Sequence, residues 1–307
     1  MRLKSIFPID NNKKKVFLSF EGIKTEVQYF EGIIKYRDKL NVNPNIEIIL
    51  MLRNHTFLGW SNPLKAMERT KFCIDNLSKN QRNVSSFISS VVEYCFYNSS
   101  YFSTKEDASS LYDHLLSLIN SKFNLKKDDS FDFTLYLADD IKKSILSELD
   151  KNYKIEKLDE FINSQFISFN PKRDKVCLIV DRDSRSVNNK QYERLVNKCR
   201  DNKFSLYVSN PCFEFWLLLH FNEVLNLDKD QLLDNKKLSD DESPIHYCEY
   251  ELKKLLSEFE KNNICFNQLI NRIAIAIKNE KNFKESIIDL KTELGSNVGL
   301  LLKELLI

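Results

Sequence analysis

The sequence predicts an α/β fold in which helices flank a parallel sheet, and three short apolar runs are the main observations behind this prediction. Val16–Phe20, Val176–Val180 and Phe204–Val208 are dominated by β-branched and large apolar residues. Such runs are typical of strands buried on both faces. Apolar residues at helical spacing separate the second run from the third, which predicts a parallel, right-handed strand–helix–strand unit.

The first run leads into a carboxylate that local structure does not explain. Glu21 is expected to be the last residue of the strand that begins at Val16, and Gly22 permits the tight turn that follows. Thr25 is expected to be the N-cap of the next helix, in a capping box with the glutamine three residues later. Glu26 then lies in the first helical turn, where the helix dipole stabilises a carboxylate. Glu21 has no comparable structural role.

The second run is followed by two carboxylates one residue apart, Asp181 and Asp183. Alternate residues of a strand point the same way, so both side chains can aim at one point if the extended geometry persists. Open α/β sheets bind ligands at the carboxyl ends of their strands, and a divalent cation relieves the repulsion between close carboxylates. A plain turn is the alternative, because Asp and Arg are common after strands.

The third run leads into SNPCFEFWLLLHF, residues 209–221. The segment Pro211–Phe221 is apolar nearly all round, which predicts a buried helix. Glu214 is its one charged residue, and a buried carboxylate needs a cation, hydrogen-bond donors or solvent. Ser209 and Asn210 are expected to shape the turn between strand and helix.

The remaining pattern indicates an interrupted core. Ile46–Met51 is expected to be a strand and Pro63–Leu77 a helix. The interval before the aspartate pair is longer than a compact strand–helix unit needs. We therefore expect core segments at 1–77 and 171–307, separated by a mostly helical insertion at 78–170. Further helices are expected at Cys248–Lys261, Asn267–Lys278 and Asn297–Leu306.

The insertion contains a group of aromatic residues whose role can be interpreted in two ways. They can form the insertion's own core, which is the favoured reading, or they can stack on unpaired bases. These residues are Tyr94, Phe96, Tyr97, Tyr101 and Phe102.

Composition excludes several classes of protein. The 307 residues carry a formal net charge of +2, so no global basic field indicates nucleic-acid binding. The chain has no Walker or Rossmann glycine motif. Its seven cysteines include no C-x-x-C pair, and its four histidines show no mutual ligand spacing. With no leader-like start and no run of membrane-spanning length, we expect a cytoplasmic protein with free thiols.

The order strand–Glu-Gly–helix, then strand–Asp-x-Asp, resembles the TOPRIM domain of topoisomerases, primases and a group of nucleases. The segments Glu21–Glu26 and 209–221 resemble motifs of the RloB-like family, a TOPRIM-related group from prokaryotic phage-defence loci. All these motifs occur in the expected order, each after a predicted strand. The resemblance implies a TOPRIM-like core.

The resemblance also implies a metal-dependent nuclease. Glu21, Asp181 and Asp183 would hold Mg²⁺ or Mn²⁺, since oxygen ligands select hard divalent cations. Glu26 and Glu214 are candidates for a second metal ion or for orienting the attacking water. Together these five carboxylates are the candidate catalytic residues.

Substrate-binding residues are less well defined by the sequence. Family nucleases are expected to need a basic residue near the cleaved bond, and no motif identifies it. Lys24 and Lys278 are the candidates, although Lys24 also reads as a solvated turn lysine.

The resemblance further implies a toxic effector of abortive infection that cleaves RNA, with tRNA as the first choice. DNA nicking and a non-catalytic subunit are the alternatives. A separate ABC- or AAA-type ATPase is expected to restrain the effector, and a homodimer is left open. Leu227–Pro244 and Asn297–Leu306 are candidate partner surfaces, or else an ordinary solvated loop and core helix.

Overall fold

The computed structural model describes most of the chain: residues 2–4, 13–22, 24–52, 62–78, 81–98, 104–132, 136–152, 155, 158–165, 167–238, 245–256, 259–260 and 263–307. The chain divides into two compact units. The core unit contains Lys14–Lys71 and Lys175–Ile307, and the helical unit contains Arg2–Lys13 and Phe72–Asp174.

The sheet of the core unit confirms the α/β class. Four strands run parallel in the order β3-β2-β6-β7, and the short strand β8 pairs antiparallel with β7 at the end of this series. The sheet is therefore mixed, whereas the sequence predicted parallel strands alone. The strands are β2 (Lys14–Phe20), β3 (Ile46–Leu52), β6 (Lys175–Asp181), β7 (Ser205–Asn210) and β8 (Gly295–Ser296).

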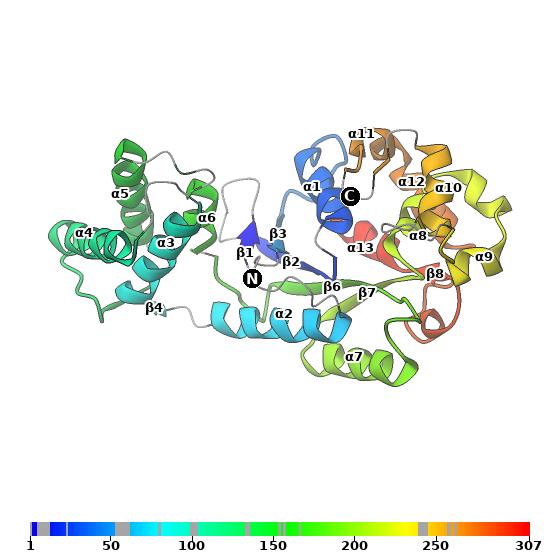
Figure 1. Cartoon of the computed structure of the whole chain (residues 1–307), viewed down its shortest axis with the longest axis horizontal. Coiled ribbons are helices and arrows are strands. Elements are labelled where there is room, and N and C mark those ends of the chain that lie inside the picture. The colour runs from blue at the N-terminus through cyan, green and yellow to red at the C-terminus, as the bar shows by residue number, and fades with distance from the viewer. Residues whose placement is uncertain are drawn as a thin grey trace. The chain divides into compact units, whose positions relative to one another are not determined.

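Helices cover both faces of this sheet. In Figure 1, α2 and α7 lie on one side, and α1 and α13 lie on the other. Helix α2 (Pro63–Leu77) begins in the core unit and ends in the helical unit. The other helices of the core unit are α1 (Thr25–Lys35), α7 (Asn189–Asp201), α8 (Phe213–Leu218), α9 (Lys229–Asp234), α10 (Tyr247–Leu255), α11 (Phe266–Leu269), α12 (Ile273–Glu280) and α13 (Val298–Leu305), with 3-10 turns at Asn222–Asn226, Ile270–Arg272 and Asp289–Lys291.

Strand β2 illustrates how both faces are buried. Val16, Leu18 and Phe20 belong to a large hydrophobic cluster that includes residues of α1, α8 and α13. On the opposite face, the Ser19 hydroxyl contacts the Thr70 hydroxyl of α2 at 2.6 Å. Because side chains alternate along a strand, one apolar run supplies both layers of the core.

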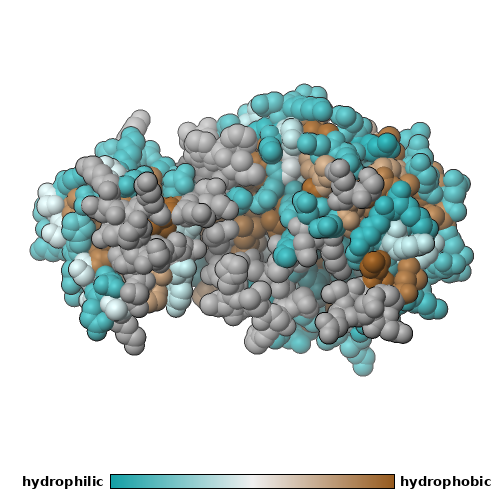
Figure 2. Space-filling model, turned by 45° about the horizontal axis from the view of Figure 1, so that its top comes forward, coloured by the Kyte–Doolittle hydropathy of each residue, from teal (hydrophilic) through white to brown (hydrophobic). Residues whose placement is uncertain are grey.

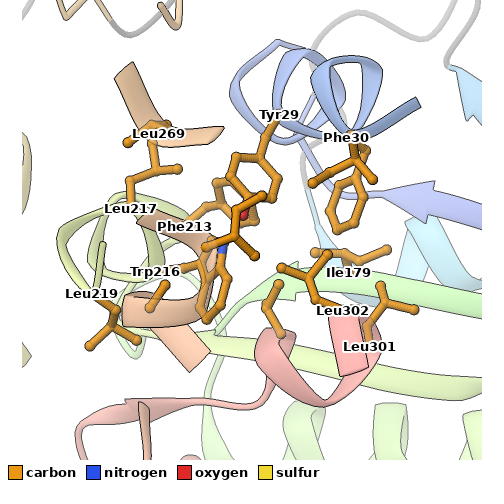
Figure 3. Close-up of a cluster of buried hydrophobic side chains, with 14 of the residues drawn as sticks. Tyr29, Phe30, Ile179, Phe213, Trp216, Leu217, Leu219, Leu269, Leu301 and Leu302 are labelled. Carbon is orange, nitrogen blue, oxygen red and sulfur yellow. The ribbon is translucent and has the colours of Figure 1, made fainter. Parts of the chain in front are cut away.

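A buried aromatic cluster joins α1 to α8 (Figure 3). The Tyr29 ring meets those of Phe213 and Trp216 edge to face, with centroids 5.6 and 6.3 Å away. Nδ1 of His220 lies 3.3 Å from the Trp216 carbonyl oxygen, so Nδ1 carries the proton and the Tyr29 hydroxyl donates to Nε2 at 3.0 Å. Burial lowers the pKa of His220 to about 4, so this ring is a neutral packing group.

Four expectations about helices are wrong. The helix expected at Cys248–Lys261 ends at Leu255, as α10. The N-cap of α1 is Lys24, without a side-chain cap bond, and Gln28 instead accepts the backbone N–H of Ile264 at 2.9 Å. Helix α8 starts at Phe213, because Cys212 is extended. The helix expected at Asn267–Lys278 is divided between α11, a 3-10 turn and α12.

The helical unit has a hydrophobic core of its own. Tyr94 is buried there and stacks on Phe161 with centroids 4.1 Å apart, which supports the core reading for this residue. Tyr97 is 74% exposed, and Tyr101 and Phe102 lie outside the described residues. The elements are β1 (Arg2–Lys4), the antiparallel pair β4 (Gln81–Asn83) and β5 (Ser130–Asp132), α3 (Val84–Asn98), α4 (Lys105–Phe123), α5 (Tyr136–Asn152) and α6 (Leu158–Gln165).

The visible surface is mainly hydrophilic, with hydrophobic residues in small patches (Figure 2). Within the described part of the chain, no helix combines the length and the apolar character needed to cross a lipid bilayer.

One buried acid gives the core unit a distinctive pH dependence. The Glu280 side chain at the end of α12 is fully buried, and its Oε1 accepts the backbone N–H of Gly299 at 2.8 Å. Burial, reinforced by the neighbouring carboxyl of Glu285, raises the pKa of Glu280 from 4.5 to about 8. The folded state therefore keeps this proton over a pH range in which the unfolded chain has lost it.

We predict that the wild-type protein loses stability as the pH rises and that the Glu280→Gln variant does not show this loss. Because the folded pKa is raised, the protonated acid stabilises the fold fully below pH 4.5, and this contribution is lost as pH rises through about 8. Urea unfolding between pH 5 and 8 should show the wild type losing up to about 1.4 kcal/mol per pH unit relative to the variant. Glu223→Gln, at an exposed position, serves as the control. The same dependence of the unfolding free energy on pH in wild type and in Glu280→Gln would contradict the prediction.

Candidate active site at the carboxyl ends of the parallel strands

Glu21 and Asp181 lie side by side because β2 and β6 are parallel neighbours. Phe20 ends β2, so Glu21 follows the strand instead of ending it as predicted. The Glu21 N–H still donates to the Ile179 carbonyl at 3.0 Å, which continues the β2–β6 pairing by one residue. The Asp181 N–H in turn lies 3.3 Å from Glu21 Oε2. Two of the three predicted metal-binding residues therefore meet at one strand end.

Asp183 begins a tight turn just beyond β6. Its Oδ1 accepts the N–H of Arg185 at 3.0 Å, and its carbonyl accepts the N–H groups of Ser186 and Val187 at 3.2 and 3.0 Å. The alternative prediction for this segment, a turn after the strand, is thus correct for the backbone at Asp183. Asp181 and Asp183 both line one pocket, although the extended geometry assumed by the alternation argument ends at Asp181.

The arginine between the two aspartates holds this turn in place. The Arg182 side chain is 1% exposed and donates to the Val187 carbonyl at 2.6 Å and to Asn189 Oδ1 at 2.7 Å. Its guanidinium lies 5.0 Å from the centre of the Tyr192 ring. Burial lowers the pKa of Arg182, while Tyr192 and Asp183 oppose that shift. Arg182 points into the protein, so it braces the aspartates instead of contacting a ligand.

A pocket of about 700 Å³ opens at these strand ends. It is lined by four predicted catalytic carboxylates, Glu26, Asp181, Asp183 and Glu214, and by Lys24. Glu21 is absent from the lining residues but contacts Asp181, as described above. Lys278 is exposed on α12 and does not line the pocket.

Glu26 has a structural role as well as a place in the pocket. The side chain is 5% exposed, and Oε1 accepts the backbone N–H of Gly22 at 3.1 Å. A Cβ atom at Gly22 would lie 2.2 Å from Glu26 Oε2, so any larger residue at position 22 must displace this carboxylate. The glycine therefore permits the turn to close onto the carboxylate of α1.

One wall of the pocket comes from a segment in which the sequence revealed no site. The stretch Leu227–Pro244 was expected to be a loop or a partner surface, but it contains α9, and residues 233–235 and 237 line the pocket. Asp234 lies 2.9 Å from Arg185, and Lys236 and Arg185 together lower the pKa of Asp234. His246 and Glu249 also line the pocket, and no sequence motif had identified them or Lys237 as site residues.

The donor chemistry of the site fits a hard divalent cation, because every acidic side chain offers oxygen ligands. In the part of the chain that the structure describes, no three Asp, Glu, His or Cys side chains are gathered closely enough to hold one ion. Coordination by Glu21, Asp181 and Asp183 therefore requires side-chain rotation from the observed positions.

Comparison with known protein families identifies the chain's relatives. The family model described as RloB-like protein matches residues 16–305. The chain belongs to the RloB-like family. The matched range extends over residues of both compact units. Searches of curated proteins and of solved structures found no match.

We predict that Arg182→Met destabilises this RloB-like protein by about 2–4 kcal/mol. The substitution removes a buried cation and leaves the Val187 carbonyl and the Asn189 side chain without their donor. Arg185→Met is the matched control and should cost less than about 1 kcal/mol, since Arg185 is 44% exposed. Equal unfolding free energies for the two variants, measured in urea, would contradict the bracing role of Arg182.

Proposed function

We propose that this RloB-like protein is a metal-dependent phosphodiesterase that cleaves a nucleic acid strand. One observation carries the proposal: a pocket at parallel strand ends combines several carboxylates with cationic side chains. Carboxylates suit the divalent cation of a phosphoryl-transfer site, and cations suit the phosphate backbone. Its volume of about 700 Å³ lies within the usual range of small-molecule sites, so a nucleotide can enter.

In this proposal Glu21, Asp181 and Asp183 hold Mg²⁺ or Mn²⁺. When bound, the ion supplies charge neutralisation at the phosphate and a lowered pKa for a coordinated water. Arg182 fixes the turn that begins at Asp183, just beyond the end of β6 at Asp181.

Glu26 and Glu214 are the candidates for orienting water or for a second ion. Both side chains are buried and line the pocket, at 5% and 6% exposure. Glu26 is held at the start of α1 by Gly22, and Glu214 lies in the first turn of α8. Carboxylates fixed in this way can accept a hydrogen bond from water without large rearrangement.

The basic side chains of the pocket provide the substrate contacts that the sequence motifs left unassigned. Lys24 at the start of α1 and Lys237 after α9 both line the pocket. Arg185 also lines it and is held by Asp234. These three cations are suited to bind phosphate groups of the strand on either side of the cleaved bond.

RNA is the substrate that we propose first, with tRNA ahead of other RNAs, on the strength of the family's phage-defence association. In that setting the protein is a toxic effector that a separate ATPase restrains. The α9 segment is our candidate contact for such a partner, because it forms a pocket wall. Helix α13 is mainly buried, which favours its reading as a core helix. Sequencing of RNA and DNA ends from cells that express the protein distinguishes the two substrate classes.

We predict that Asp181→Asn lowers phosphodiester cleavage by at least about 10²-fold, through loss of electrostatic stabilisation of the phosphate. Purified wild type and variant should be assayed on single-stranded RNA, a tRNA pool, single-stranded DNA and plasmid, each with Mg²⁺, Mn²⁺ or a chelator. The control is Asp201→Asn at the end of α7, where the aspartate is 70% exposed and outside the pocket.

Full activity of Asp181→Asn, or undiminished activity in chelator, would contradict the proposed chemistry. If the wild type cleaves none of these substrates yet still binds an ATPase from its own operon, the non-catalytic alternative replaces the nuclease.

A further inference from the structure

The pocket contains a histidine that the proposed reaction does not use. His246 is the N-cap of α10, is half-buried and lines the same pocket as Asp181 and Asp183. The reaction proposed above moves a proton from the attacking water, and imidazole is the side chain best suited to exchange protons near neutral pH.

Hydrogen bonding fixes the tautomer of this ring. His246 Nδ1 lies 3.0 Å from the backbone carbonyl oxygen of Asn235. Since a carbonyl oxygen only accepts, Nδ1 carries the proton of the neutral ring and Nε2 carries the lone pair. The ring is therefore prepared to accept a proton at Nε2.

The carbonyl that orients His246 is itself held firmly. Asn235 adopts a left-handed conformation, with φ of 43°, at the end of α9. Its Oδ1 accepts the backbone N–H of Cys248 at 2.9 Å, and its own N–H donates to the Gln231 carbonyl at 2.9 Å. Asn235 thus links α9 to α10 and sets the position of the His246 ring between them.

The other described histidines use Nε2 for structure. His220 Nε2 accepts from Tyr29, and His114 Nε2 lies 2.9 Å from Glu148 Oε1 in the helical unit. Within the described part of the chain, His246 Nε2 has no hydrogen-bond partner. Among these three rings, only His246 combines a fixed tautomer, an unused lone pair and a place in the pocket.

The charged groups around this ring are of both signs. Lys237 pairs with His246 through a backbone bridge, and Asp234 lies one residue before the orienting asparagine. Glu249 follows in the first turn of α10 and is paired with Lys253 at 3.0 Å. Arg185 also lines the pocket and contacts Asp234 at 2.9 Å. No one of these groups gives the ring an alternative partner at Nε2.

We propose that His246 is the general base of the phosphodiester cleavage, an assignment that rests on the proposed function. As the water oxygen bonds to phosphorus, Nε2 takes one proton from that water and the ring becomes imidazolium. The ester P–O bond then breaks, and the departing oxygen takes a proton either directly from the imidazolium or from solvent to which the imidazolium releases its proton, so the neutral ring is restored in both cases. The products are a phosphate monoester and an alcohol, so atoms and charge balance.

The test compares His246→Asn with His246→Ala and with the control His114→Asn. Asparagine can still donate to the Asn235 carbonyl and is a favourable N-cap, so His246→Asn removes the base but keeps the local structure. We expect kcat to fall by about 10²–10⁴-fold with KM and Tm unchanged. The acid limb of the kcat–pH profile, where a base becomes protonated, should disappear in this variant. Added imidazole should restore part of the activity of His246→Ala, and His114→Asn should behave as the wild type.

Two results overturn the assignment alone. One is a fully active His246→Asn beside an inactive Asp181→Asn. The other is a loss of activity that imidazole does not rescue and that coincides with a lower Tm, which identifies a structural role. A wild type that cleaves no nucleic acid overturns the proposed function and the base together.

Discussion

The parallel pairing of β2 with β6 is the constraint on which the rest of the site depends. It brings Glu21 and Asp181 to the same edge of the sheet, 160 residues apart in sequence, with the Asp181 N–H directed at the Glu21 carboxylate. Strand β7 continues the series, so the turn that leads to Glu214 opens on the same edge. The segments that leave three neighbouring parallel strands therefore form one part of the pocket, and α9 and the start of α10 form another.

This arrangement concentrates negative charge, and the structure contains hydrogen-bond donors and cations that stabilise the carboxylates. Backbone N–H groups contact three of the carboxylates, Glu21, Glu26 and Asp183. The buried Arg182 side chain stabilises the turn that begins at Asp183 through hydrogen bonds to Val187 and Asn189. Cationic side chains line the pocket on its other segments. In the proposed function, a bound cation would neutralise these carboxylates and stabilise the fold further.

Features encoded by local pattern were predictable from the sequence. The strands have runs dominated by apolar residues, and Asp181 and Glu21 stand out because charges directly after such runs lack a local explanation. The family resemblance rested on the segments Glu21–Glu26 and 209–221, and it is confirmed by the match over residues 16–305. Helix ends were less predictable, since Gln28 serves a tertiary contact with Ile264 in place of the expected cap.

The wall formed by α9 and the start of α10 could not be predicted. Its residues carry no motif. Their position depends on Asn235, whose backbone carbonyl and side chain bond to His246 and Cys248 at the start of α10. These segments are distant in sequence from the strand ends. His246 was one of four histidines without ligand spacing, and only the fold places it in the pocket. Sites assembled by packing in this way leave no signal in residue spacing.

The central claim is that the carboxylates at these strand ends form a divalent-cation site. Anomalous diffraction from crystals of the protein grown with Mn²⁺ tests it most directly. The account predicts a manganese peak coordinated by Glu21, Asp181 and Asp183, with their side chains rotated toward the ion. A pocket without manganese at saturating concentration, or a peak bound only by residues outside the pocket, would contradict it.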